Sequence, residues 1–136
     1  MRIFPGKRPT GLGANKGKLR PPPATPNGVS SQADPKTDPD HYVEPLPFKG
    51  KPKEAWARRM HQLRAMPRVT IVKEAGTYVH AECASRLLGF IDDLECVLDR
   101  TAGVIHVRSA ARMGRRDFGV NRARIDAVRA GLASAS

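Results

Sequence analysis

The sequence has few aromatic residues and no long apolar run. Each of these shortages excludes some classes of protein. Aromatic residues make up 5% of the 136 residues, so a core must consist mainly of Val, Ile, Leu and Ala. No apolar segment approaches the ~18 residues of a membrane-spanning helix. The first residues also lack the apolar stretch of about 7–15 residues that a secretory signal contains. We therefore predict no membrane segment and no export, and we expect a cytoplasmic protein.

Metal and nucleophile motifs are also scarce. The two cysteines, Cys83 and Cys96, belong to no CxxC motif and lie near no histidine pair. Because a metal site needs several converging ligands, we predict no metal and instead two buried, reduced thiols. The glycine-rich stretch at 11–17 lacks the preceding strand and following helix of a phosphate loop, and no G-x-S-x-G motif is present. No catalytic residue and no cofactor are predicted from these motifs.

Basic residues are abundant and concentrated toward the ends of the chain. There are 24 Lys and Arg residues against 13 Asp and Glu residues, which gives a formal charge of +11. Residues 1–33 contain six basic residues and no acidic one, whereas residues 67–110 are nearly neutral. This balance favours an anionic partner, but it concerns encounter and solubility and not the fold.

The first fifty residues differ in composition from the rest. Residues 1–50 hold ten of the twelve prolines and six of the twelve glycines. Proline fixes φ and lacks an N–H donor, so neither a helix nor a central strand suits this segment. It is either a disordered tail or an extended arm over the folded part. The steady spacing of its apolar residues favours the arm, because disordered tails usually lack such anchors. We predict one domain, with an arm at 1–50 and a core at 51–136.

Two segments have the spacing of amphipathic helices. In residues 52–66, Pro52 suits a first turn, and Arg59 is expected away from the apolar face. The last helix is predicted to start between Asp117 and Asn121, either of which could cap it. The predicted apolar faces consist of Ala55, Trp56, Met60 and Leu63 in the first helix and of Ile125, Val128 and Leu132 in the last.

The segment "SRLLGFIDDLECVLD" at 85–99 fits either a helix or a strand. Its apolar residues recur at helical spacing, yet residues 90–99 also alternate in character. The flanking segments 77–86 and 103–112 alternate clearly, and glycine-containing turns separate all three. This favours a strand within a meander. With a further strand before residue 76, we predict an α+β fold in which a four-stranded antiparallel sheet has helices before and after it on one face.

The apolar faces of the last two predicted strands define their register. Leu98 is expected opposite Ile105, and the other face then pairs Glu95 with Arg108. A slip of one residue would disrupt both faces together, so the register is well specified. The polar face of the predicted sheet contains Glu82, Arg86, Asp93, Glu95, Arg108 and Arg112, with His80 and His106 toward one end.

Three interpretations of this polar face remain open. The first is a salt-bridge lattice on a solvated sheet face. The second is a site for an anionic ligand or a protein segment, since arginines suit carboxylate and phosphate groups. The third is acid–base catalysis. Interleaved arginines would compete with magnesium for the carboxylates, which disfavours that ion. A separate arginine-rich stretch at 112–124, with Asn121 and Arg122, surrounds a helix N-terminus, and is either an anion site or a solvated basic edge.

Five motifs in order suggest a family. They are "GKL" at 17–19, "PNGVSSQA" at 26–33, "SRLLGFIDDLE" at 85–95, "GVIHVRSAAR" at 103–112 and "DFGVNRARI" at 117–125. Together they resemble the bacterial and plastid family called domain of unknown function 1499. The resemblance covers nearly the whole chain and implies a single such domain that includes the first fifty residues. It implies structural or binding roles for matching positions, but no function.

Three functions are compatible with these observations. The leading hypothesis is a non-catalytic binding module in which Arg86, Arg108 and Arg112 hold an anion or a protein segment. The second is nucleic-acid binding through the basic ends, for which the few aromatics offer little stacking. The third is a small enzyme that uses Asp93 or Glu95 with His106. We favour a protein that is not an enzyme, and an open sheet face would also suit a homodimer.

Overall fold

A computed structural model describes residues 6–85, 89–114, 117 and 119–135, without the side chains of 132–135. It has an α+β fold, as the sequence predicts. The elements are β1 (Ala14–Asn15), β2 (Lys18–Leu19), β3 (Gly28–Ser30), β4 (Leu46–Pro47), α1 (Pro52–Ala65), β5 (Val69–Ala75), β6 (Tyr78–Ala84), β7 (Ile91–Asp99), β8 (Val104–Ala111) and α2 (Val120–Ala135).

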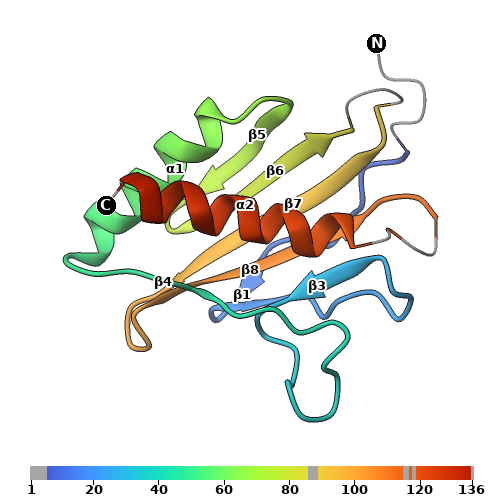
Figure 1. Ribbon diagram of the computed structural model, residues 1–136, viewed down its shortest axis with the longest axis horizontal. Helices are drawn as coiled ribbons and strands as arrows, with labels where there is room; N and C mark the ends of the chain where they lie inside the picture. Colours follow the sequence, from blue (N-terminus) through green and yellow to red (C-terminus); the bar gives the residue numbers. More distant parts are fainter. Residues whose placement is uncertain (1–5, 86–88, 115–116, 118, 136) are drawn as a thin grey trace.

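The main sheet is antiparallel and has the order β3-β8-β7-β6-β5, with β4 also pairing with β8. Strands β5 to β8 form the predicted meander. Both helices lie across the same face of the sheet (Figure 1). Among the described helices, none has the length and apolar composition needed to cross a bilayer.

The predicted strand at 90–99 and its register are confirmed. Strand β7 pairs Leu98 with Ile105 and Glu95 with Arg108 on β8, and β6 places Glu82 opposite Asp93. The alternating pattern was sufficient because a shift of one residue would have moved the apolar side chains to the other face.

The predicted number of strands is wrong, since the sheet has six strands and not four. The two extra strands come from the first fifty residues, so this segment is not simply an extended arm. Residues 28–30 pair with 108–110, and residues 46–47 pair with 104–105. Strands of two or three residues are too short to show an alternating pattern, and Gly28 and Pro47 are residue types that are depleted in strands.

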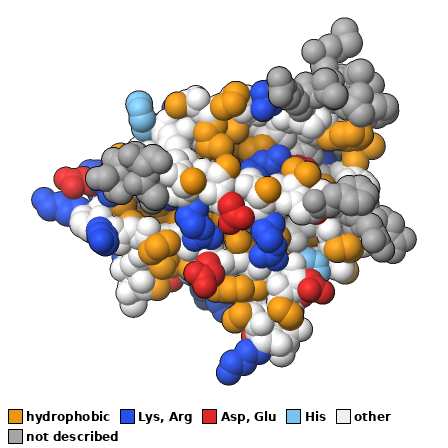
Figure 2. Space-filling model, viewed as in Figure 1, with side chains coloured by type: hydrophobic (Ala, Val, Ile, Leu, Met, Phe, Trp, Pro, Cys, Tyr) orange, Lys and Arg blue, Asp and Glu red, His pale blue; other side chains and the backbone are white. Residues whose placement is uncertain are grey.

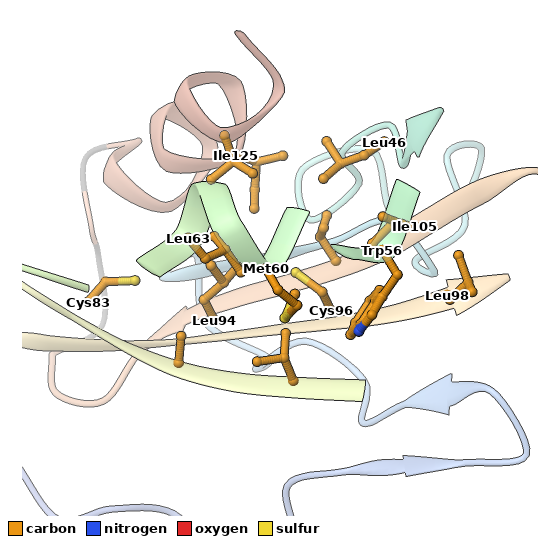
Figure 3. Packing of buried hydrophobic residues seen from close by; sticks show 14 of the residues in the cluster. Leu46, Trp56, Met60, Leu63, Cys83, Leu94, Cys96, Leu98, Ile105 and Ile125 are labelled. Carbon is orange, nitrogen blue, oxygen red and sulfur yellow. The ribbon is translucent and has the colours of Figure 1, made fainter. Parts of the chain in front are cut away.

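The core fills the space between the sheet and the two helices. Trp56, Met60 and Leu63 of α1 and Ile125 and Val128 of α2 pack against the inward residues of the strands. Figure 3 shows these side chains between the helices and the sheet. The prediction for the cysteines is confirmed, because both are buried and free. Their sheet neighbours in this core are Val79, Ala81, Leu94, Leu98, Ile105 and Val107.

One prediction about α1 is wrong, because Arg59 lies inside the core with an exposed fraction of 0%. Its Nη1 donates to the Val128 carbonyl (2.8 Å) and to Gln62 Oε1 (2.5 Å). Burial lowers the pKa of this arginine to about 10. A long side chain that reaches a carbonyl of α2 can stay buried, and helical spacing alone does not reveal this. The side chain of Leu132 lies outside the described residues.

Helix α2 begins with Asp117 as its capping residue. The Asp117 carboxylate accepts hydrogen bonds from the amides of Gly119 (2.9 Å) and Asn121 (3.2 Å). This satisfies donors that have no partner within the helix. Of the two predicted caps, the structure therefore uses Asp117, and Asn121 is buried with an exposed fraction of 0%.

Candidate functional site

The polar face of the sheet carries a network of charged side chains from three adjacent strands and the residue after β8. Arg112 binds Asp93 through two nitrogens, Nη2 to Oδ1 (2.6 Å) and Nε to Oδ2 (3.0 Å). Its Nη2 also donates to Glu82 (2.8 Å). Asp93 accepts a further bond from His80 Nε2 (2.7 Å). Because side chains alternate along each strand, the charged residues come together on the face opposite the apolar core.

Residues 6–23 lie over this polar face. Arg8 Nε donates to Glu82 (2.7 Å), the Gly13 amide donates to Glu95 (2.9 Å), and Arg108 Nε donates to the Pro21 carbonyl (3.1 Å). Below the sheet in Figure 3, the blue β1-β2 hairpin lies on the side away from the helices. There Leu19 packs with Tyr78 and Val97. The polar face is therefore buried, and not a solvated lattice.

Burial and pairing shift the pKa values of this network in opposite directions. Hydrogen bonds from Arg8 and Arg112 lower the pKa of Glu82 to about 2. Burial acts to raise the pKa of Asp93, but the bonds from His80 and Arg112 hold it below its usual value. Burial and the hydrogen bond that Tyr78 donates to Glu95 (2.5 Å) raise the pKa of that phenol. The carboxylates Glu82 and Asp93 are consequently charged at neutral pH.

A cavity of about 260 Å³ lies between residues 7–23 and the end of β8. Four cationic side chains line it, and Asp93 is the acidic side chain among its described lining residues. Its cationic lining consists of Lys7, Arg20, Arg108 and Arg112. We call this cavity the arginine pocket.

Arg108 is a buried cation of the arginine pocket whose carboxylate partner lies beyond hydrogen-bond distance. Its side chain is 7% exposed, and its Nη1 lies 3.7 Å from Glu95 Oε1, which is beyond a normal hydrogen bond. That carboxylate oxygen is buried and has no hydrogen-bond partner among the described residues. Burial lowers the pKa of Arg108, the negative charge of Glu95 opposes this, and the nearby positive charge of Arg20 lowers the pKa further.

The structure brings together five of the eight residues that the sequence suggested for a site. These five are Glu82, Asp93, Glu95, Arg108 and Arg112. Asn121 lies on the helix side instead, and Arg122 donates to the Asp40 carbonyl (3.1 Å) away from the polar face. The prediction for Arg86 falls outside the described residues.

Asn121 belongs to a second buried network, which joins α2 to the sheet. It accepts a hydrogen bond from Ser109 (2.5 Å) and donates to the Asn27 carbonyl (3.2 Å). Arg124 donates to Asp92 (2.6 Å) and to Asn121 (2.9 Å). Burial raises the pKa of Asp92, although Arg124 opposes this.

A family model, described as "Protein of unknown function (DUF1499)", matches residues 18–132. The chain belongs to the DUF1499 family. Of the charged residues that line the arginine pocket, the match includes Arg20, Asp93, Arg108 and Arg112 and leaves out Lys7. No curated protein and no solved structure matches the chain.

The sequence analysis missed one series of hydrogen-bonded polar side chains in this DUF1499 domain, which consists of Ser31, His106 and Asp99. Ser31 Oγ lies 3.0 Å from His106 Nδ1, and His106 Nε2 lies 3.2 Å from Asp99. This order is that of a hydrolytic triad. However, Ser31 Oγ accepts the Val107 amide (2.8 Å), and Ser31 does not line the cavity onto which His106 opens. These hydrogen bonds therefore link the end of β3 to β8, and no local motif could have indicated them, because Ser31 lies 75 residues before His106.

The sequence suggested a pairing of Asp93 or Glu95 with His106, but the hydrogen bonds of these side chains go to other residues. His106 bonds to Ser31 and Asp99, whereas Asp93 bonds to His80 and Arg112, and Glu95 bonds to Tyr78. Over the described part of the chain, no group of three or more His, Cys, Asp or Glu residues has the geometry to hold a metal ion. The described arrangement presents arginine side chains, a type of group that matches carboxylate and phosphate oxygens.

Proposed function

We propose that this DUF1499 protein is a non-catalytic binding module that holds a small anion in the arginine pocket. The observation that carries the proposal is the state of Arg108. This guanidinium is buried, its closest carboxylate oxygen lies at 3.7 Å, and Arg20 adds a second positive charge nearby. A buried cation whose carboxylate partner lies beyond hydrogen-bond distance is costly, and an anion between Arg108 and Arg20 would reduce that cost.

The charge of the pocket supports an anionic ligand. The one acidic lining residue, Asp93, is already paired with Arg112 and His80. Arg20, Arg108 and Lys7 are therefore not neutralised by it. Guanidinium groups match carboxylate and phosphate oxygens in a forked geometry.

The size of the pocket restricts the ligand class. Its volume of about 260 Å³ lies below the ~300–1,000 Å³ of sites for drug-sized molecules. Inorganic phosphate or a small dicarboxylate is the appropriate class. Arg108 and Arg20 would contact the anion, while Glu82 and Asp93 would position Arg112.

Nucleic-acid binding receives less support. On the helix side, Lys and Arg side chains are interspersed with Asp and Glu and form no continuous basic surface (Figure 2). Phe90 is the one aromatic residue among the exposed large hydrophobics of the described residues, which offers little surface for base stacking.

Calorimetric titration with inorganic phosphate and with succinate, at physiological salt, tests the proposal. We expect saturable binding of one anion per chain and at least a tenfold loss of affinity in Arg20→Ala, roughly what a charge-assisted contact supplies. Arg20 is exposed, so this variant should fold. Arg58→Ala, which removes an equally exposed arginine on α1, is the matched control.

A second variant, Arg108→Lys, keeps the positive charge but removes the fork, and we expect weaker binding with an unchanged circular dichroism spectrum. Equal affinity in Arg20→Ala, Arg58→Ala and the parent would contradict the proposal. Absence of saturable binding to both anions would contradict it as well. Native mass spectrometry of the protein from its own host would then identify any bound mass directly.

A further inference from the structure

A cavity of about 690 Å³ lies where β6 and β8 end and where β7 and α2 begin. It adjoins the arginine pocket at Ala111, which lines both, but its walls include Asp92, Val120 and Arg124 and none of Arg20, Arg108 or Arg112. Its size is within the range of small-molecule sites.

Apolar side chains form most of this cavity. The exposed large hydrophobic residues of the described chain are Phe90, Met113 and Val120, with exposed fractions of 41%, 46% and 48%, and all three line it. Ala84 and Ile91 add further apolar wall. Scattered apolar residues need no explanation, but several that gather at one concave site mark a binding surface.

The cavity is not wholly apolar, because the guanidinium group of Arg124 also lines it. Arg124 uses Nη1 for its hydrogen bonds to Asp92 (2.6 Å), Asn121 (2.9 Å) and Ser109 (3.4 Å). Among the described residues, its Nε and Nη2 donate no hydrogen bond. They are therefore donors that a ligand acceptor can engage.

The charges of the lining favour a neutral head group. Among the lining residues that the structure describes, Arg68 and Arg124 are matched by Asp92 and Asp117. An anionic head would meet both carboxylates, and a cationic head would meet both guanidinium groups. A carbonyl or hydroxyl oxygen accepts a hydrogen bond from Arg124 without adding a charge.

We propose that this cavity binds a small amphipathic molecule, with an apolar body against Phe90, Met113 and Val120 and a neutral oxygen head at Arg124. The proposal does not depend on the arginine pocket, since it uses different residues and a ligand of different charge. Apolar burial supplies the affinity, and the single polar contact supplies the orientation.

Fluorescence titration with the neutral dye Nile red, followed by competition with 1-decanol and with decanoate, tests the proposal. We expect saturable binding of one dye per chain with a blue shift of its emission. The double variant Met113→Gln/Val120→Gln should bind at least about tenfold more weakly, because two apolar contacts are lost. Both side chains are nearly half exposed, so folding should be preserved. Val72→Gln on β5, outside the cavity, is the matched control.

Competition by 1-decanol but not by decanoate would support the neutral head, and stronger competition by decanoate would overturn it. Equal dye affinity in the double variant and the control would overturn the site. A second copy of the chain could occupy the same surface instead of a ligand, and size-exclusion chromatography tests for such a dimer. A dimer that dissociates in the double variant would assign the surface to self-association and overturn the ligand proposal.

Discussion

Arg112 shows how a single side chain joins the strands of the polar face. It follows β8, binds Asp93 of β7 through two nitrogens and reaches Glu82 of β6. This contact pattern needs the planar fork of a guanidinium, which an ammonium group cannot reproduce. The network therefore requires the geometry of the Arg112 guanidinium group as well as its positive charge.

We predict that Arg112→Lys lowers the free energy of unfolding by about 1–3 kcal/mol, since buried carboxylate oxygens lose hydrogen-bond donors. Urea unfolding followed by circular dichroism measures this loss. Arg122→Lys is the control, because Arg122 donates to a backbone carbonyl at an exposed position. A similar loss in both variants would show that the fork has no special role.

We predict that Glu82 makes stability depend on pH in the acid range. Its folded pKa of about 2 lies below the ordinary value of 4.5. A carboxylate whose pKa is lowered on folding stabilises the protein above its unfolded pKa. This contribution is lost as the pH falls from about 4.5 toward 2.

Chemical unfolding at a series of pH values from 6 to 2 checks this prediction. Glu82→Gln should be less stable than the parent at pH 6, and the difference should shrink at acid pH. Glu44→Gln, at an exposed position, should show the slope of the parent. A constant difference between parent and Glu82→Gln at every pH would refute the assignment.

The site residues that the sequence predicted lie on long alternating strands. Glu82, Asp93, Glu95 and Arg108 could be placed together because the apolar residues of the same strands fix the register. Lys7 and Arg20 could not be predicted, because they reach the pocket from an irregular segment. Ser31 and His106 are separated by 75 residues, and no local pattern relates them.

At the scale of elements, β3 is the strand whose formation depends most on close packing. A Cβ atom on Gly28 would lie 2.8 Å from Pro23 Cδ and 2.9 Å from Ala110 Cβ. Strand β3 thus fits between β8 and the segment that runs over the polar face. Asn27 followed by Gly28 is a strong local turn signal, yet Gly28 begins β3 and pairs with Ala110 of β8, so the pairing outweighs that signal.

We predict that Gly28→Ala destabilises the protein by about 1–3 kcal/mol through overpacking. In the double variant Gly28→Ala/Ala110→Gly, one of the two close contacts is removed, so part of the loss should be recovered. Thermal unfolding of the two single variants and the double variant gives the coupling. Strictly additive effects would mean that these two residues do not press on each other.

At the scale of the whole molecule, the formal charge of +11 predicts weak, nonspecific attraction to nucleic acid. Affinity for a single-stranded oligonucleotide should fall at least about tenfold between 50 and 200 mM salt, because counterions are released on binding. Fluorescence anisotropy with two unrelated sequences measures this. A strong sequence preference that persists at 200 mM salt would instead support specific nucleic-acid binding as the function.

The pairing of β3 and β4 with β8 has a consequence for biosynthesis. The ribosome makes residues 28–30 and 46–47 long before residues 104–110, their partners. The same holds for Arg8, Gly13 and Pro21, which bond to Glu82, Glu95 and Arg108. A nascent chain that ends before β8 thus has no pairing partner for β3 and β4, and its Glu82 and Asp93 lack the hydrogen bonds that Arg112 donates. Such a chain must complete its sheet late, after β8 has emerged, and a stop within β8 would leave the first third of the protein without its template.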